Sequence, residues 1–302
     1  MLTAAIETLS LVKRYGSALA LDGLSMTVPR GEIFGFLGPN GAGKTTAVKL
    51  LLGLAKPTAG EGAVLGAPFG DLQTRRRIGY LPELFRYQDW LSAREVLALH
   101  CALLGVARAD RDQEIQQALT AVGLAARADH RVGGFSKGMQ QRLGLGVALL
   151  GRPELVILDE PTSALDPVGR HDAREIILAI KRRGATVFLN SHLLTEVEKV
   201  CDRVAIVDRG RILQVGRLDE LLHGEVVRVR FASAPTEAVK TLLAQYGNAV
   251  QKDGWLMLSG VGVERIPDLV ERLVHTGARI QAVEQSRSTL EERFLEVLEE
   301  DG

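Results

Sequence analysis

Cysteine, aromatic residues and long apolar runs are all scarce in this chain. The two cysteines, Cys101 and Cys201, lie far apart and lack a CxxC spacing, so neither a disulfide framework nor a zinc site is indicated. Both are expected to be buried free thiols. No apolar run approaches the ~18 to 20 residues that cross a bilayer, and the N-terminus lacks the pattern of a secretory signal. Contact with a membrane is therefore expected only through a partner protein.

An excess of either charge is also missing. The 37 Lys and Arg residues balance the 37 Asp and Glu residues, so no overall positive charge points to a polyanion such as DNA or RNA. Hydrophobic residues at 46% and charged residues at 25% are typical of a soluble globular protein. A chain of 302 residues is long enough for one large domain or two modest ones.

Residues 1–222 have the pattern of an α/β domain. The segment 33–37 is apolar on both faces, which is typical of a strand in the middle of a parallel sheet. A helix at 168–183 separates two later strands, and a hairpin at 204–215 closes the domain. Strand alternating with helix indicates a doubly wound sheet. The strands predicted before the closing hairpin are 6–11, 24–28, 33–37, 155–158 and 186–189.

A helical insert interrupts this domain from about residue 84 to 150. The insert has little strand character, and a capping box from Ser92 to Glu95 begins its first predicted helix at Val96. Because the strand pattern returns only at Leu155, these helices are expected to form a subdomain beside the sheet.

Residues 223–302 are expected to form a second, smaller domain. Their predicted order, β-α-β-β-α-β, is that of a split βαβ, ferredoxin-like module of α+β class. Its hairpin turn is expected at Asp253-Gly254. A last helix is expected to begin with a capping box from Ser288 to Glu291.

A phosphate-binding motif follows the buried strand 33–37. The segment from Gly38 to Thr45 fits GxxxxGK[ST] between a predicted strand and a predicted helix. Backbone N–H groups can wrap a phosphate only where no Cβ intervenes, and a helix N-terminus adds free donors and partial positive charge. Lys44 is expected to reach the β- and γ-phosphates, and the Thr45 hydroxyl to bind Mg²⁺. The residues expected to contact the nucleotide here are Gly38, Pro39, Asn40, Gly41, Ala42, Gly43, Lys44, Thr45 and Thr46.

Two adjacent acids form the second half of the predicted site. Asp159 and Glu160 follow four apolar residues, a pattern that indicates a buried strand with carboxylates at its C-terminal edge. Open α/β sheets bind ligands at that edge. Asp159 is expected to hold Mg²⁺ and Glu160 to act as general base for the attacking water.

Three further segments, in chain order, resemble motifs of the ABC ATPases. Phe135 to Arg142 resembles the LSGGQ signature, Ser163 to Asp166 resembles the D-loop, and Asn190 to His192 resembles the segment with the switch histidine. The resemblance covers residues 5 to about 220. It implies a P-loop NTPase core with an antiparallel β subdomain and a helical insert.

The resemblance also implies how the site is assembled. Two nucleotide-binding domains sandwich two ATP molecules, so Ser136 and Gly138 of one protomer would face the nucleotide held by the other. His192 would contact the γ-phosphate, which makes it a catalytic candidate beside Glu160 and Lys44. Asp166 would lie at the dimer interface, and Tyr15 would stack on adenine.

The chain departs from the family pattern at two places. Lys137 and Met139 stand in the signature where Gly and Gln are frequent, while Ser136 and Gly138 remain. Glu83 stands where the family usually has a glutamine that senses Mg²⁺ and the attacking water. A carboxylate at that position can still hold water or metal, so we count Glu83 among the nucleotide and metal residues.

The expected function is that of an ATP-hydrolysing subunit, with ATP and Mg²⁺ as cofactors, that drives a separate transmembrane permease. By this resemblance the chain works as a homodimer, or as a heterodimer with a paralogous ATPase, at the cytoplasmic face of the cell membrane. The alternative is a soluble ABC protein acting on the ribosome or nucleic acid. Such proteins usually have fused ATPase units or a long coiled coil, and neither pattern is present. A small-molecule kinase is disfavoured because it would not need the segment from Ser136 to Arg142.

Overall fold

The chain divides into two compact units. The computed structural model describes residues 4–163, 165–222, 225–252, 254–259, 261–287 and 289–301. One unit comprises Met1–Leu218 with Val297–Gly302, and the other comprises Asp219–Glu296. The domain boundary predicted between residues 222 and 223 stays a prediction, since residues 223 and 224 lie outside the described residues.

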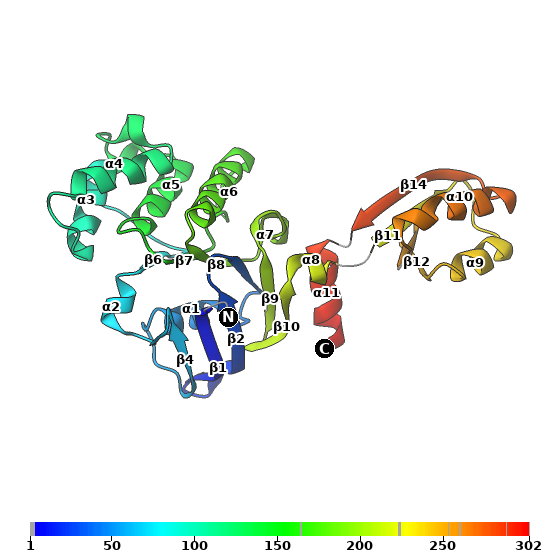
Figure 1. The fold of residues 1–302 in the computed structure, drawn as a ribbon, viewed down its shortest axis with the longest axis horizontal. Coiled ribbons are helices and arrows are strands. Elements are labelled where there is room, and N and C mark those ends of the chain that lie inside the picture. Colours follow the sequence, from blue (N-terminus) through cyan, green and yellow to red (C-terminus); the bar gives the residue numbers. More distant parts are fainter. Residues whose placement is uncertain are drawn as a thin grey trace. The chain divides into compact units, whose positions relative to one another are not determined.

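The first unit combines strands, a helical insert and flanking helices (Figure 1). Its strands are β1 (Ala4–Tyr15), β2 (Ala18–Pro29), β3 (Ile33–Leu37), β4 (Ala59–Val64), β5 (Ala67–Pro68), β6 (Ile78–Leu81), β7 (Leu155–Asp159), β8 (Thr186–Ser191), β9 (Arg203–Asp208) and β10 (Arg211–Arg217). Its α-helices are α1 (Lys44–Leu51), α2 (Leu72–Arg75), α3 (Ala93–Leu104), α4 (Arg111–Ala121), α5 (Lys137–Ala148), α6 (Pro167–Arg182), α7 (Leu194–Val200) and α8 (Leu218–Leu221).

Two sheets organise the described part of this unit. The six-stranded sheet has the order β10-β9-β3-β8-β7-β6, in which β10 runs antiparallel to β9 and the other neighbours are parallel. The second sheet is antiparallel, with the order β2-β1-β4-β5. The doubly wound core and the antiparallel subdomain are thus present. Strand β4 was not predicted because its sequence, AGEGAV, contains two glycines and little apolar alternation.

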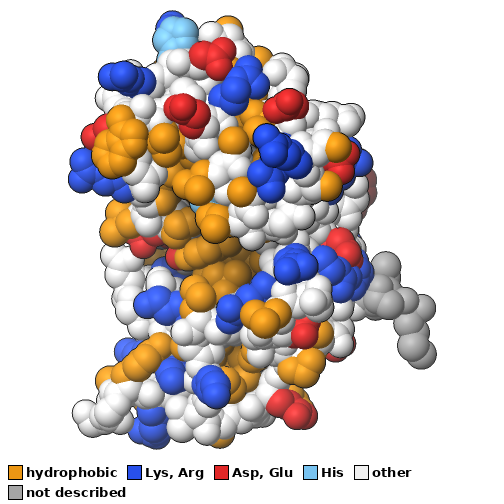
Figure 2. All heavy atoms as spheres, turned by 90° about the vertical axis from the view of Figure 1, so that its left-hand side faces the viewer, with side chains coloured by type: hydrophobic (Ala, Val, Ile, Leu, Met, Phe, Trp, Pro, Cys, Tyr) orange, Lys and Arg blue, Asp and Glu red, His pale blue; other side chains and the backbone are white. Residues whose placement is uncertain are grey.

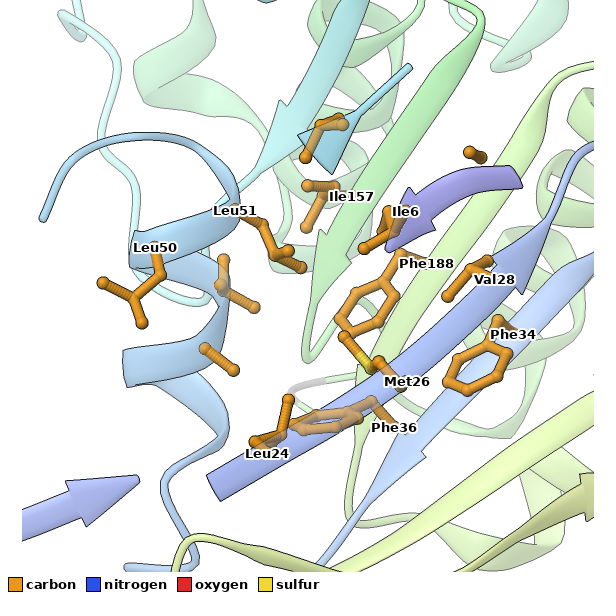
Figure 3. Close-up of a cluster of buried hydrophobic side chains, with 14 of the residues drawn as sticks. Ile6, Leu24, Met26, Val28, Phe34, Phe36, Leu50, Leu51, Ile157 and Phe188 are labelled. Atoms are coloured by element: carbon orange, nitrogen blue, oxygen red, sulfur yellow. The ribbon is translucent and has the colours of Figure 1, made fainter. Parts of the chain in front are cut away.

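The hydrophobic core lies between the two sheets and α1. Figure 3 shows side chains of β1, β2, β3, β7, β8 and α1 meeting in one cluster. Phe188 packs in this cluster against Phe34 and Phe36, at ring-centroid distances of 5.9 and 5.3 Å. All five residues of β3 are buried, as expected for a strand covered on both faces.

The helical insert begins with the predicted capping box, but its first helix starts inside the box, at Ala93 and not at Val96. The Ser92 side chain accepts a hydrogen bond from the Glu95 amide, and the Glu95 carboxylate accepts one from the Ser92 amide, which completes the capping box of α3. Helices α3, α4 and α5 follow without a strand, and α5 lies beside α6 (Figure 1).

The second unit contains β11 (Glu225–Phe231), α9 (Glu237–Ala244), β12 (Asn248–Lys252), β13 (Trp255–Ser259), α10 (Ile266–His275) and β14 (Ile280–Arg287). Its sheet is antiparallel with the order β12-β13-β11-β14, so the β-α-β-β-α-β sequence of elements is the predicted one. Of the predicted turn Asp253-Gly254, Asp253 lies outside the described residues.

The last helix, α11 (Leu290–Asp301), begins with a capping box one residue later than predicted. Thr289 and Glu292 exchange the two hydrogen bonds of the box, whereas Ser288 lies outside the described residues. The sequence Ser-Thr-Leu-Glu-Glu contains two overlapping S/T-x-x-E patterns, and the pattern alone did not separate them.

Both cysteines are buried free thiols, as predicted. Burial raises the pKa of Cys101 and of Cys201, so neither is an activated nucleophile. Within the described residues, none of the helices combines the length and apolar character that crossing a membrane requires.

We predict that Ser92→Ala destabilises the helical insert by about 1 kcal/mol, because the Glu95 amide loses its side-chain acceptor. Ser92→Thr retains an acceptor and serves as the matched control. Urea unfolding followed by circular dichroism measures the difference, and equal unfolding free energies for the two variants would contradict it.

Candidate functional site

Four neighbouring parallel strands bring their carboxyl ends to one edge of the sheet. In the order β3-β8-β7-β6, these ends lead into the loop at Gly38, the segment with His192, the acids Asp159 and Glu160, and the turn with Glu83. This edge is where open α/β sheets bind ligands. The structure therefore assembles segments that are more than a hundred residues apart in sequence.

The loop 38–43 is closed against neighbouring backbone at two of its glycines. A Cβ on Gly38 would lie 2.3 Å from the Val207 carbonyl oxygen, and one on Gly43 would lie 2.4 Å from the Ala20 carbonyl oxygen. Gly41 has a φ of 86°, and a Cβ there would meet nothing within 4 Å. The loop thus packs against neighbouring backbone at Gly38 and Gly43 and leaves open space at Gly41. A phosphate cradle needs such an open side.

Lys44 begins α1 at this loop and is 8% exposed. Its Nζ donates to the carbonyl oxygens of Gly38 at 2.7 Å and Pro39 at 3.1 Å. Burial lowers the pKa of Lys44, and the charges of Glu160 and Asp159 oppose that shift. The ammonium group is thereby held over the loop, with carboxylates close by.

Asp159 is buried at the end of β7 and bonded to the neighbouring strand. Its Oδ1 accepts a hydrogen bond from the Asn190 amide nitrogen on β8. Burial raises the pKa of Asp159, and the Asn190 hydrogen bond opposes the increase. The Asn190 Oδ1 is buried without a hydrogen-bond partner among the described residues. Asn190 therefore orients the carboxylate.

Glu160 faces the exposed side chain of His192. The Nδ1 of His192 lies 2.8 Å from the Glu160 Oε2, while the Glu160 side chain is only 8% exposed. Glu160 has a φ of 52°, a left-handed conformation that is costly for a residue with a Cβ. Its amide donates to the Asn190 carbonyl at 2.9 Å, which ties this conformation to β8.

The β9–β10 turn is hydrogen-bonded to loop 38–43. The Gly210 amide donates to the Ala42 carbonyl at 3.0 Å, and the Gly210 carbonyl accepts from the Asp22 amide at 2.9 Å. Arg211 adds a hydrogen bond of 2.8 Å to the Asp22 carboxylate. The loop, the turn and β2 are therefore linked by hydrogen bonds in series.

Three further candidate residues, Tyr15, Ser136 and Asp166, lie at the ends or starts of other elements. Tyr15 ends β1, is 49% exposed and has the Lys13 Nζ 4.8 Å from its ring centroid. Ser136 is the N-cap of α5 and accepts from the Met139 amide, and Asp166 is the N-cap of α6. Within the described ranges, neither cap makes a hydrogen bond or ion pair with loop 38–43.

The comparison with known proteins decides the family. The sequence profile of the family described as ABC transporter matches residues 21–163. An uncharacterized ABC transporter ATP-binding protein of Synechocystis sp. is 40% identical, over 98% of this chain and 85% of that protein. The chain belongs to the ABC transporter ATP-binding family. The resemblance inferred from the motifs is thereby confirmed.

Two further ABC proteins show the extent of the likeness. The bacitracin transport ATP-binding protein BcrA of Bacillus licheniformis is 36% identical over 97% of both chains. A solved ATP-binding subunit of an ABC transporter has a TM-score of 0.65 and 32% identity, covering 72% of this chain and 92% of its own. The chain is thus an ATP-binding subunit of a transporter. The alternative function, on the ribosome or nucleic acid, is not favoured.

Sequence reasoning missed two residues of this ABC site. Asn190 was noted only as a neighbour of His192, and Gly210 only as part of a hairpin. Both act through strands that are distant in sequence: Asn190 is paired with Asp159 in the β7–β8 register, and Gly210 reaches Ala42. The sequence signal that could have identified Asn190 is a polar residue at the end of the apolar run that predicts strand 186–189.

We predict that Gly38→Ala lowers ATP affinity at least about tenfold, because its Cβ would meet the Val207 carbonyl and displace the loop. Gly66→Ala is the control, since Gly66 has a φ of 84° and no neighbour within 4 Å of a Cβ, so strain is added away from the loop. Calorimetric ATP titration compares the two. Equal affinities would show that the loop is not closed as described.

Proposed function

We propose that the chain hydrolyses ATP as part of a dimer at the cytoplasmic face of the membrane and drives translocation through a separate transmembrane permease. The observation that carries this proposal is the pairing of Glu160 with His192, at 2.8 Å, beside the buried Lys44. A degenerate site would have no need for a strained, buried carboxylate aimed at a histidine.

ATP would bind with its phosphates over loop 38–43. The amides of the loop and of the first turn of α1 lie at the positive end of the helix, where anions are stabilised. Lys44 would exchange its bonds to the Gly38 and Pro39 carbonyls for phosphate oxygens. The exposed ring of Tyr15 offers a stacking surface for adenine.

The donors present fit Mg²⁺. Thr45 supplies a hydroxyl and Asp159 a carboxylate, and Glu83 adds a second carboxylate whose charge acts on both Lys44 and Asp159. The described residues hold no cluster of three or more His, Cys, Asp or Glu side chains suited to a metal. One or two carboxylates together with water and phosphate oxygens is the arrangement that Mg²⁺ prefers. The ion would neutralise charge on the phosphates.

Hydrolysis would use Glu160 as the general base. The carboxylate takes a proton from a water molecule whose oxygen bonds to the γ-phosphorus, and the bond from that phosphorus to the bridging oxygen breaks to give ADP and phosphate. His192, whose Nδ1 lies 2.8 Å from the Glu160 Oε2, would orient this carboxylate. The Asn190 carbonyl fixes the backbone of Glu160.

The hydrogen bonding of Ser136, which involves α5 and not its own loop 38–43, supports a sandwich dimer. Ser136 caps α5, and its hydroxyl accepts from the Met139 amide, so the hydroxyl hydrogen is free to donate to a phosphate. Gly138 and Asp166 lie at the starts of neighbouring helices. A second protomer, identical or paralogous, would place its phosphate against these groups.

The segment after Glu83 is a suitable surface for the permease. Leu84 is 88% exposed and Trp90 is 70% exposed. Between them in sequence, the rings of Phe85 and Tyr87 pack at a tilt, and the Tyr87 ring meets His100 of α3 edge-on. Figure 2 shows the side of the first unit to which α2 and α3 belong, with hydrophobic side chains along a hollow and Lys and Arg beside it. A partner docked at Leu84 would lie next in sequence to Glu83, one of the candidate metal residues.

We predict that Glu160→Gln slows ATP turnover by about 10²- to 10⁴-fold while ATP affinity is kept, because the base is lost and the phosphate contacts are not. The variant should also accumulate as an ATP-bound dimer in sedimentation velocity. Glu61→Gln, on the exposed part of β4, is the charge-matched control. Unchanged turnover would contradict the role of Glu160, and a monomer in saturating ATP would contradict the sandwich.

We predict that the double variant Leu84→Asp, Trp90→Asp loses most of its recovery with membranes of its native host while its ATP affinity stays unchanged. Charges on this apolar surface would prevent docking of the partner. Leu9→Asp, on the exposed face of β1, controls for added charge. Equal membrane recovery of both proteins would place the docking surface elsewhere.

A further inference from the structure

A cavity of about 690 Å³ lies at the amino-terminal end of β7, opposite the edge that carries the nucleotide site. It is open to solvent on one side and is lined by α4, the end of α5, the start of β7 and the end of α6. Its apolar lining includes Ala121, Leu149, Pro153, Val156 and Ile180. The volume falls in the range of ~300 to 1,000 Å³ that is typical of sites for drug-sized ligands.

Helix α5 and strand β7 connect this cavity with the nucleotide site. Helix α5 follows Ser136 at one end, and its C-cap, Leu149, lines the cavity at the other. Strand β7 ends in Asp159, and Val156 near its start lines the cavity. Strand β7 thus ends at the candidate nucleotide site, and α5 begins at Ser136, which we propose faces the nucleotide of a second protomer.

Helix α6 makes the same connection. It begins after Asp166, while Ile180 and the C-cap Arg183 line the cavity. Figure 1 shows α5 and α6 side by side over the sheet. Because packed helices can shift as rigid elements, a ligand that wedged the cavity ends of α5 and α6 would displace the ends with Ser136 and Asp166.

The charges around the cavity favour an anion. Glu114 pairs with Arg152 at 3.1 Å, so its charge is neutralised. The hydrogen bond from Arg77 lowers the pKa of Glu154 to about 2, and Glu154 is thus also a paired carboxylate. Arg183 makes no ion pair or side-chain hydrogen bond with any residue that the structure describes. One guanidinium is left to meet a ligand at the mouth of an apolar chamber.

We propose that this cavity is an effector site for an amphipathic organic anion, an apolar body of drug size with one carboxylate or sulfonate, and that its occupation changes the affinity for ATP. The apolar body packs against the partly exposed Ala121, Leu149 and Ala185, and the acid group pairs with Arg183. This goes beyond the transport function, since neither the ATP chemistry nor the permease surface uses the cavity.

The probe is 8-anilinonaphthalene-1-sulfonate, an apolar aromatic anion whose fluorescence rises on burial. Ala121→Trp fills the chamber from α4, and we expect at least about tenfold weaker probe binding. Ala102→Trp, at an exposed position of α3, is its matched control and should bind the probe like the parent protein. Equal probe affinity of the two tryptophan variants would overturn the proposal.

A second pair of variants tests the role of the Arg183 charge, and this pair stays informative if Ala121→Trp fails to fold. Arg183→Glu should weaken the probe roughly fivefold, the effect of one charged contact of about 1 kcal/mol. Arg182→Glu changes the neighbouring exposed arginine, which does not line the cavity, and should have no effect. Equal affinities in this pair would also count against the site.

Coupling is tested by titrating ATP with and without saturating probe. We expect ATP affinity to change by about fivefold or more, and probe affinity to change by the same factor in ATP, because coupling is reciprocal. The change in probe affinity must level off as the ATP concentration rises. A continuous loss of probe affinity with rising ATP would mean that the probe and ATP share one site. Lys44→Ala should keep full probe affinity. If loop 38–43 proves not to bind ATP, the probe measurements will therefore still test the cavity separately. ATP affinity that ignores the probe would overturn the coupling.

Discussion

The structure depends on a close backbone approach between the phosphate loop and its neighbours. Gly38 and Gly43 leave no room for a side chain against the carbonyls of Val207 and Ala20, and Gly210 bonds the loop through Ala42. These contacts use only backbone atoms, so they fix the loop without occupying its outer face. The open side can then present amide groups to phosphate.

Much of the site could be predicted because it follows local chemistry. The buried run 33–37 before the glycines predicted strand, loop and helix, and the acids after Leu158 predicted a second strand end at the same edge. The family motifs supplied Ser136 and Asp166. Both residues are N-caps, at the start of α5 and of α6, so their positions follow from local helix-start patterns in the sequence.

The rest could not be predicted because it depends on pairing between distant strands. Asn190 meets Asp159 only through the β7–β8 register, and the linkage from Gly210 to Ala42 joins positions 168 apart by their numbering. The cavity at the amino-terminal end of β7 has no sequence motif of its own. It is lined by the C-terminal ends of α5 and α6 and the start of β7, whereas the motifs lie at the opposite ends of these elements.

We propose that loop amides, rather than side chains alone, hold the triphosphate. Hydrogen–deuterium exchange of residues 38–46, with and without ATP, tests this directly. We expect strong ATP-dependent protection of the amides from Gly41 to Thr46. Exchange in this segment that is unchanged at saturating ATP would contradict it.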